Sequence, residues 1–579
     1  MPTKKRATAS AVTKKLPAKP TKKQGTSKAS KGGDEVTPVP AKVSQSPKLK
    51  NIFEGAGFKH VPADGLHFTV GGRMGELDHI FVWENVVLLC EETAGKDATK
   101  HCTNKIYLHS KIAENWSTSF FVDYTKQNPA LVAALTQKYQ IQDLEVRHIY
   151  YSEDVDVVDS VGDPSPMRIL SRAQARYFSS LVETIARSAK FELLKFLGIA
   201  LHQVGDARVS GSDVASNSFP AFALPAAHTS YPAGFAVVSF YADPMALIQR
   251  AYVMRRDGWE DPDLSYQRFV RAEKLVAMRE YLSGNGKVFI NNLIVTLPAT
   301  ALLRDANGKP MDPNVLQHKT TVQLSLPLEL GTVGIVDGQH RILSYYEGTD
   351  QLDLQISSLR QRQNLLVTGI IFPPSYTPEM RVKFEAEIFL GINNNQSAVN
   401  TQLRQDLETI INPETPLAIA RAIVIRLSKE GALAGMLQMS HFDPSDKIAS
   451  GSLGPYVVKP LIRKNSAFYK TWDGAGVRDL HKPDDRDDYT EYCVKEFKRL
   501  LAGASEHLKG KWRSVPNGGV LSTTAVGGLL MLLDRLVKEG ATPSGIDYKV
   551  KLKNIEAFDF GGYTGSSWGK LSNKLNEAL

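Results

Sequence analysis

Residues that could bind phosphate follow one another in the sequence DGQHR, which lies between an apolar run and a helix-like pattern. Arg341 carries the planar fork that binds two phosphate oxygens at once, and His340 and Gln339 add hydrogen-bonding groups. Asp337 has the chemistry to hold Mg²⁺ or to orient an attacking water. These types predict a phosphate site that includes Gly338, with Asp337 and His340 as catalytic candidates. A purely structural reading stays open, because Asp before Gly is also a common helix N-cap.

Acidic residues form a second group with possible chemistry. Glu76 and Asp78 lie on one expected strand, and Glu91 lies at the end of the next. Carboxylates on adjacent strands can share a divalent cation, which activates water and neutralises a phosphodiester. We therefore expect these three residues to hold Mg²⁺, with Asp78 and Glu91 as catalytic residues for hydrolysis of nucleic acid. Surface acids at strand ends are the structural alternative.

Apolar patterns predict the elements that position both groups. Strands over Leu77–Val82 and Val86–Cys90 form a hairpin through a Trp-Glu-Asn turn, and then a helix, a strand and a long helix follow. Around the first group, GTVGIVD predicts a buried strand, Gly338 permits a tight turn, and HRILSYYEG begins a helix. The first N–H groups of a helix are unpaired and favour an anion, which supports the phosphate interpretation.

The DGQHR motif resembles the signature of the DGQHR-domain family, which is similar to DndB, the DNA-phosphorothioation regulator, and more remotely to the ParB/sulfiredoxin-like fold. YQRFVRAEKLVAMREYL, Tyr266–Leu282, resembles the family's early helix, and FLGINNNQSAVNTQLRQDL, Phe389–Leu407, resembles its second block. The resemblance covers Gly234 to Ile411. Sulfiredoxin-like chemistry needs a cysteine where this chain has Gln339, so sulfinic acid reduction is not expected.

The resemblance implies a pocket for a nucleotide (ATP, CTP or GTP) or for a nucleic-acid phosphate. Its residues would be Gly338, Gln339, His340 and Arg341 from the motif and Asn393, Asn394 and Gln396 from the second block. The run of asparagines has an alternative interpretation as a left-handed turn at a helix end, which Asn tolerates well.

The order of elements around the acids resembles the restriction-endonuclease-like fold. That pattern has a lysine two residues after the second acid, whereas this chain has Thr93. Lys96, Lys105 or Lys111 would have to supply the ammonium from the following loop or helix. The alternative is a domain that keeps the fold and binds DNA without cutting it.

Charge is concentrated at the N-terminus. Residues 1–50 contain 13 Lys and Arg and two acids, which leaves 57 basic and 59 acidic residues in 51–579. The composition of this tail is too poor in apolar residues for a folded core, so we expect it to be disordered and to attract DNA or RNA non-specifically. A merely solubilising tail is the alternative. Three cysteines in no paired motif favour a reducing compartment.

We therefore expect an α/β (α+β) chain in which a restriction-endonuclease-like domain precedes a ParB/sulfiredoxin-like DGQHR domain and a helical C-terminal region. The expected boundaries are 1–50 for the basic tail, 51–203 for the nuclease-like domain, 204–232 for a linker, 233–411 for the DGQHR domain and 412–579 for the helical region.

Three functions are compatible with these features. The first is a DNA-acting enzyme of a bacterial modification or phage-defence system, with an Mg²⁺-dependent nuclease-like domain and a nucleotide-binding DGQHR domain. The second is a non-catalytic, DndB-like DNA-binding regulator, and the third is an NTP-hydrolysing DNA clamp or modification accessory. The expected partners are DNA and a nucleotide but no membrane, a homo-oligomer is left open, and the expected location is the cytoplasm at the nucleoid, or the nucleus in a eukaryote.

Overall fold

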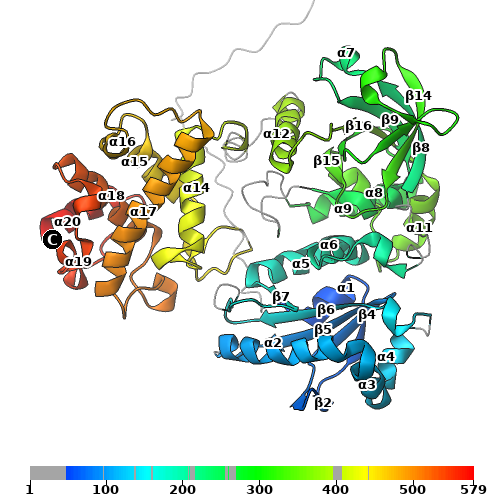
Figure 1. Ribbon diagram of the computed structural model, residues 1–579, viewed down its shortest axis with the longest axis horizontal. Helices are drawn as coiled ribbons and strands as arrows, with labels where there is room; N and C mark the ends of the chain where they lie inside the picture. The colour runs from blue at the N-terminus through cyan, green and yellow to red at the C-terminus, as the bar shows by residue number, and fades with distance from the viewer. Residues whose placement is uncertain are drawn as a thin grey trace, which may run out of the picture. The chain divides into compact units, whose positions relative to one another are not determined.

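The computed structural model has a mixed α/β fold with separate sheets and a region composed mainly of helices (Figure 1). Residues 1–46 lie outside the described part, and so do shorter internal segments. The described ranges are 47–95, 97–135, 138–157, 161–205, 208, 216–253, 259, 269–394, 407, 409–440 and 442–579. The described residues from Pro47 onward belong to one compact unit.

The first sheet has five strands among the described residues, in the order β1-β4-β5-β6-β7. They are β1 (Lys59–Pro62), β4 (His79–Trp83), β5 (Val86–Thr93), β6 (Glu145–Ser152) and β7 (Met167–Leu170). β1, β4 and β5 pair antiparallel, whereas β5, β6 and β7 pair parallel. The expected hairpin around the Trp-Glu-Asn turn is therefore confirmed.

The helices of this part are α1 (Leu49–Gly55), α2 (Ala98–Asn115), α3 (Phe121–Gln127), α4 (Pro129–Ala134), α5 (Arg172–Ile185) and α6 (Lys190–Phe196). A small hairpin of β2 (Phe68–Val70) and β3 (Arg73–Gly75) precedes β4. Leaving that hairpin aside, the chain runs α1, the antiparallel strands β1, β4 and β5, the helices α2, α3 and α4, and then the parallel strands β6 and β7. α2 is the crossover that a parallel β5–β6 pair requires.

Alternation along β5 assigns its side chains to the two faces of the first sheet. Val87 and Leu89 pack in the core that includes residues of α2, whereas Leu88 and Cys90 pack in the core that includes residues of α1 and α5. Figure 1 shows α2 on one side of this sheet and α5 on the other. Because the side-chain period of a strand is two, Glu91 continues the α2 face.

The long helix expected after the third strand follows an additional strand, β7, and is interrupted. Ser171 caps α5 by accepting a hydrogen bond from the N–H of Gln174, and the helix ends at Ile185. Ala186 then adopts φ 42°, a conformation that an α-helix cannot contain, and α6 begins only at Lys190. Helical periodicity alone does not show such a break.

The second sheet has nine strands among the described residues, in the order β10-β15-β11-β16-β9-β8-β14-β12-β13. They are β10 (Ala251–Tyr252), β15 (Val333–Asp337), β11 (Leu293–Leu297), β16 (Leu365–Ile371), β9 (Ala236–Ala242), β8 (Ser216–Leu224), β14 (Thr320–Pro327), β12 (Leu302–Arg304) and β13 (Pro310–Met311). The accompanying helices are α7 (Ala226–Thr229), α8 (Pro244–Arg250), α9 (Ala272–Asn285), α10 (Gln339–Leu343), α11 (Asp353–Arg362) and α12 (Pro378–Asn394).

The linker expected at 204–232 is wrong for its later half. β8 pairs antiparallel with both β14 and β9, so it is an interior strand of the nine-stranded sheet. Its sequence SNSFPAFAL is short of β-branched residues and contains Pro220, which disfavours a central strand. Pairing on both edges outweighs this weak local preference.

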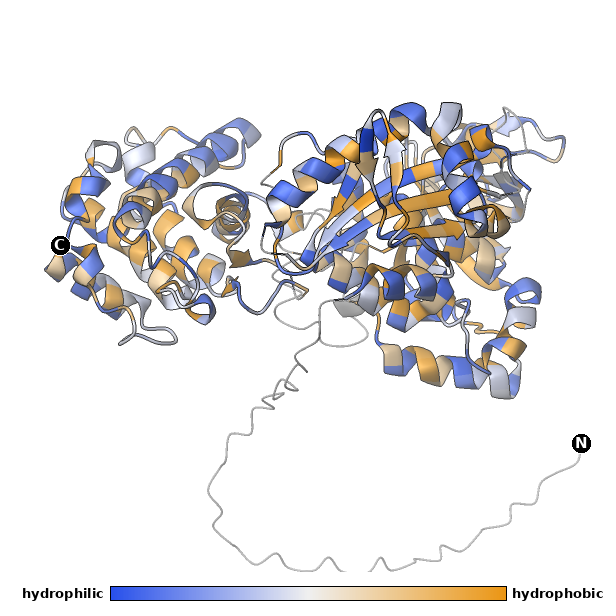
Figure 2. Ribbon diagram, turned by 90° about the horizontal axis from the view of Figure 1, so that it is seen from below, coloured by the Kyte–Doolittle hydropathy of each residue, from blue (hydrophilic) through white to orange (hydrophobic). Residues whose placement is uncertain are grey.

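The final region is mainly helical, as expected. It contains α14 (Pro416–Lys429), the π-helix η10 (Leu453–Val458), α15 (Lys459–Ile462), α16 (Ala467–Trp472), α17 (Pro483–His507), α18 (Thr523–Lys538), α19 (Tyr548–Lys551), α20 (Trp568–Ala578) and the short pair β17 (Leu437–Gln438) and β18 (Ile448–Ala449). These helices share one apolar core and keep polar residues outward (Figure 2). Among the helices in the described ranges, none has the length and apolar composition needed to cross a bilayer.

Candidate functional site

Two predicted acids meet at the end of the β4–β5 pair. Asp78 immediately precedes β4, and its Oδ2 accepts a hydrogen bond of 2.7 Å from the N–H of Glu92. The carboxyl groups of Asp78 and Glu91 are close enough that, in addition to burial, the charge of Glu91 raises the pKa of Asp78. Glu91 is fully buried on the α2 face. The antiparallel register therefore brings together two carboxylates that lie 13 positions apart in the chain.

Lys105 of α2 completes this pair with a positive charge. Its Nζ lies 2.5 Å from Oε2 of Glu91 and donates a hydrogen bond of 3.1 Å to the carbonyl oxygen of Glu76. Of the other two lysines considered, Lys111 pairs with Glu114 at 2.6 Å, and Lys96 lies outside the described residues. The strand has Thr93 where a lysine was expected. The ammonium next to Glu91 comes instead from Lys105 of the neighbouring helix α2.

Glu76 does not share the arrangement of the other two acids. Its carboxylate lies 3.7 Å from Nδ1 of His67 and is 40% exposed. Among the described residues, no group of three or more His, Cys, Asp or Glu side chains is arranged to hold a metal ion. The expected three-carboxylate site is therefore reduced to the pair Asp78 and Glu91.

Two buried histidines, His109 and His148, form a chain of hydrogen bonds that ends at Glu91. His109 Nε2 lies 2.8 Å from Oε1 of Glu91, and its Nδ1 lies 2.8 Å from Nδ1 of His148 on β6. Neither histidine was among the candidate site residues named from the sequence. The available signal was the spacing of four residues between Lys105 and His109, which places both side chains on one face of α2.

Burial dominates the electrostatics of this cluster. It raises the pKa of Glu91 to about 7, although Lys105 acts in the opposite direction. The pKa of Asp78 is also raised, by burial and by the charge of Glu91. Burial lowers the pKa of both His109 and His148 to about 3, so these two rings are neutral at physiological pH. The positive charge next to Glu91 is therefore the ammonium of Lys105.

The DGQHR motif forms the expected strand, turn and helix. β15 ends at Asp337, Gly338 adopts φ 100°, and α10 begins at Gln339. A side chain at Gly338 is excluded twice over, because that φ favours glycine and an added Cβ would lie 2.5 Å from Leu293. The helix is shorter than expected, since it ends at Leu343 after five residues. The dipole of such a short helix is small, so it attracts an anion only weakly.

Arg341 is partly engaged within the motif. Its guanidinium lies 2.8 Å from Oδ2 of Asp337, and 18% of its side chain is exposed. His340 accepts a hydrogen bond of 3.3 Å at Nε2 from the N–H of Arg271. Burial and the nearby charges of Lys274 and Arg271 lower the pKa of His340 to about 4. This corner is basic and partly open, but its arginine already has a carboxylate partner.

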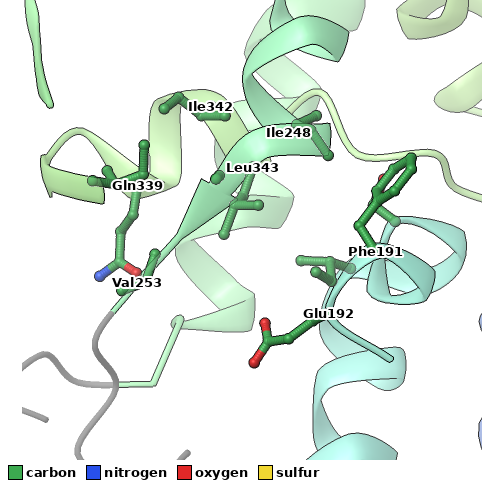
Figure 3. A pocket seen from close by; sticks show the side chains of 11 residues that line it. Phe191, Glu192, Ile248, Val253, Gln339, Ile342 and Leu343 are labelled. Atoms are coloured by element: carbon green, nitrogen blue, oxygen red, sulfur yellow. The ribbon is translucent and has the colours of Figure 1, made fainter. Parts of the chain in front are cut away.

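Gln339 lines a cavity in which about 30 Å³ is available to a water-sized molecule (Figure 3). Its other lining residues include Glu192 of α6, from the first part of the chain, and apolar side chains of α10. The Oε1 atom of Gln339 is buried and has no hydrogen-bond partner among the described residues. A space of this size fits a water molecule and is far too small for a nucleotide.

The second block is only partly described. Asn393 and Asn394 are the last residues of α12, and the structure does not describe their side chains. Gln396 lies outside the described residues. Their predicted approach to the DGQHR motif therefore stays a prediction.

Comparisons with protein-family models, curated proteins and solved structures found no match for this chain. The DGQHR and restriction-endonuclease-like resemblances therefore stay predictions. The geometry of Asp78, Glu91 and Lys105 is independent of them, because it follows from the packing of α2 on the first sheet.

Proposed function

We propose that this protein acts on DNA and that Asp78, Glu91 and Lys105 form a phosphodiester-hydrolysing site that depends on a divalent cation. The observation that carries the proposal is the ion pair of 2.5 Å between Lys105 and Glu91. It supplies a cation to a carboxylate pair whose strand carries Thr93 where the predicted pattern has lysine. The order of elements supports the same assignment, because a helix and three antiparallel strands are followed by helices and then by two parallel strands of the same sheet.

The residues present fit a hard cation. Asp78 and Glu91 are adjacent, and burial disfavours their charged forms, so a bound cation would relieve an unfavourable concentration of negative charge. Mg²⁺ is typically bound by one or two carboxylates together with water and substrate phosphates, so a group of three protein ligands is not required. When bound there, Mg²⁺ would polarise a phosphoryl oxygen and lower the pKa of a water.

This proposal gives a defined task to Lys105, to His109 and to Asp78. Lys105 would donate to a non-bridging phosphate oxygen and stabilise the charge that develops on it during hydrolysis. His109 holds Oε1 of Glu91 and fixes the orientation of the carboxylate, as hydrogen-bonded neighbours of metal ligands commonly do. Asp78 is held by the N–H of Glu92, so both carboxylates are positioned before a substrate arrives.

A cleavage assay on purified full-length protein tests this function. Supercoiled and linear DNA are incubated with Mg²⁺ or with EDTA, and each condition is repeated with ATP, CTP or GTP. Cleavage should require the divalent cation and should be lost in Asp78→Asn and Glu91→Gln. Cleavage that persists in both variants would place the chemistry elsewhere, and phosphate release without strand breaks would favour the NTP-hydrolysing alternative.

A non-cutting, DNA-binding role is the second candidate, and the complete burial of Glu91 favours it. A carboxylate with no exposed surface, paired with Lys105 and His109, also suits a structural network beneath a binding surface. In that case the protein would bind DNA in EDTA and would leave it intact in Mg²⁺. Asp78→Asn and Glu91→Gln would then change stability and not DNA chemistry.

A further inference from the structure

A basic and aromatic face lies on the final helical region, where sequence patterns assigned no function. No Asp or Glu occurs between Asp446 and Asp473, a stretch that contains five Lys and Arg. Most of this stretch forms η10, α15 and α16. An uninterrupted run of positive charge on folded elements differs from the basic tail, because its side chains have fixed positions.

Burial along η10 and α15 separates two faces. Val457, Val458, Leu461 and Ile462 are buried in the helical core, and Val457 points toward Gly527 of α18. Tyr456, Lys459, Pro460 and Arg463 are exposed and recur at the spacing of one helical turn. These exposed side chains therefore form one stripe. Lys464 follows Arg463 directly and is exposed, and Lys470 is exposed on α16, which contacts α15.

The cations of this stripe differ from other basic side chains of the region in their contacts. Lys459, Arg463, Lys464 and Lys470 make no ion pair and no side-chain hydrogen bond with any residue in the described part of the chain. Other cations of this region, such as Arg426 and Lys498, do form ion pairs. Tyr456 exposes 63% of its surface, although the next two residues, Val457 and Val458, are buried.

We infer that this face, defined by Tyr456, Lys459, Arg463, Lys464 and Lys470, binds single-stranded nucleic acid. These ammonium and guanidinium groups have no ionic partner in the described part of the structure, and the stretch of chain that carries them contains no acid, so they attract the phosphates of a strand. An exposed tyrosine among them offers a ring on which an unpaired base can stack. Bases in a duplex are already stacked on one another, so the aromatic group favours a single strand. The inference does not depend on the proposed cleavage site.

Binding of a fluorescent single-stranded oligonucleotide to the full-length protein in EDTA tests this assignment. The charge variant Lys459→Ala, Arg463→Ala, Lys464→Ala is compared with a matched control, Lys509→Ala, Lys553→Ala, Lys570→Ala. The control removes three exposed lysines of the same region that also lack ion pairs among the described residues. The basic tail is identical in every variant, so its contribution cancels, and thermal melts verify that each variant is folded.

The charge variant should lower the dependence of log affinity on log salt by about 2, as three lost phosphate contacts predict, and the control should not. Tyr456→Ala should weaken single-strand binding about tenfold, and Tyr456→Phe should restore it, because phenylalanine keeps the stacking surface. Equal losses in the charge variant and the control would overturn the inference. Three other results would also contradict it. They are an unchanged affinity of Tyr456→Ala for the oligonucleotide, a preference of the protein for duplex DNA, and equally tight binding of polyglutamate used as a competing anion.

Discussion

Lys105 on α2 and Glu91 on β5 form an ion pair of 2.5 Å in which the carboxylate is fully buried and the lysine is 15% exposed. The pair joins a helix to the strand that precedes it, on the face of the sheet that carries Asp78. A buried carboxylate beside one ammonium and one further acid has an excess of negative charge. That excess is the physical basis for the predictions about this site.

Lys105→Met should abolish any cleavage while Lys111→Met leaves it nearly unchanged. Methionine keeps much of the apolar stem but removes the ammonium, so the charge on the phosphate is no longer stabilised, and a loss of about 100-fold or more is expected. Lys111 lies on the same helix but pairs with Glu114. Cleavage rates for both variants at saturating Mg²⁺ provide the check. Equal rates in the two variants would remove Lys105 from the mechanism.

The free energy of unfolding should reveal the raised pKa of Glu91. The pKa is about 7 in the folded protein and 4.5 when unperturbed, so the contribution of this group is fully present below pH 4.5 and is lost as pH rises through 7. Relative to Glu91→Gln, the wild type should lose up to about 3 kcal/mol between pH 4.5 and 8. Urea unfolding of both proteins in EDTA measures this difference. A pH-independent difference would show that Glu91 is not perturbed as described.

Divalent cations should stabilise the wild type above pH 7. A cation that binds only the folded state raises the free energy of unfolding, and at 100 times its Kd the gain is about 2.7 kcal/mol. Thermal melts at pH 8 with Mn²⁺ or Ca²⁺ should therefore show a higher Tm than melts in EDTA. Asp78→Asn and Glu91→Gln should lack this shift. An identical shift in the two variants would place the cation at a different site.

Gly334 on β15 should tolerate no side chain. An added Cβ would lie 2.3 Å from Oγ1 of Thr296 and 2.5 Å from the hydroxyl of Tyr252. Both hydroxyls donate to the buried carboxylate of Glu385, so moving them breaks those hydrogen bonds. Gly334→Ala should cost about 2–4 kcal/mol of unfolding free energy in urea melts.

Gly569 of α20 provides the matched control for Gly334. An added Cβ there meets nothing within 4 Å, so Gly569→Ala should be neutral or slightly stabilising. If the two alanine variants unfold at the same urea concentration, the close packing around Gly334 does not limit stability.

The local sequence pattern was sufficient to predict the strands, turns and helices that carry the predicted site residues. The hairpin of β4 and β5 follows from apolar runs around a short turn, and the β15, Gly338 and α10 sequence follows from an apolar strand, a glycine and a helical pattern. These features depend on neighbours in the chain, so periodicity detects them. The paired acids followed in the same way, because an antiparallel hairpin fixes which residues lie opposite each other.

Sequence periodicity does not show which residues that are distant along the chain contact each other. The pairing of β8 on both edges overrides its weak strand propensity, and the positive φ of Ala186 divides a helix whose pattern is continuous. The stripe at Tyr456 has a sequence signal, the absence of acids around it. That signal becomes a surface only when burial separates the exposed side chains from the buried ones.

The sequence by itself determined a basic N-terminal tail, the two strand-end acids and the turn at Gly338. Tertiary structure decided which lysine meets Glu91, that Arg341 pairs with Asp337, and that Gln339 faces a water-sized cavity. The physical reason is that side-chain type and spacing are local properties of the chain. The partner of a charged group depends instead on how a helix packs against a sheet.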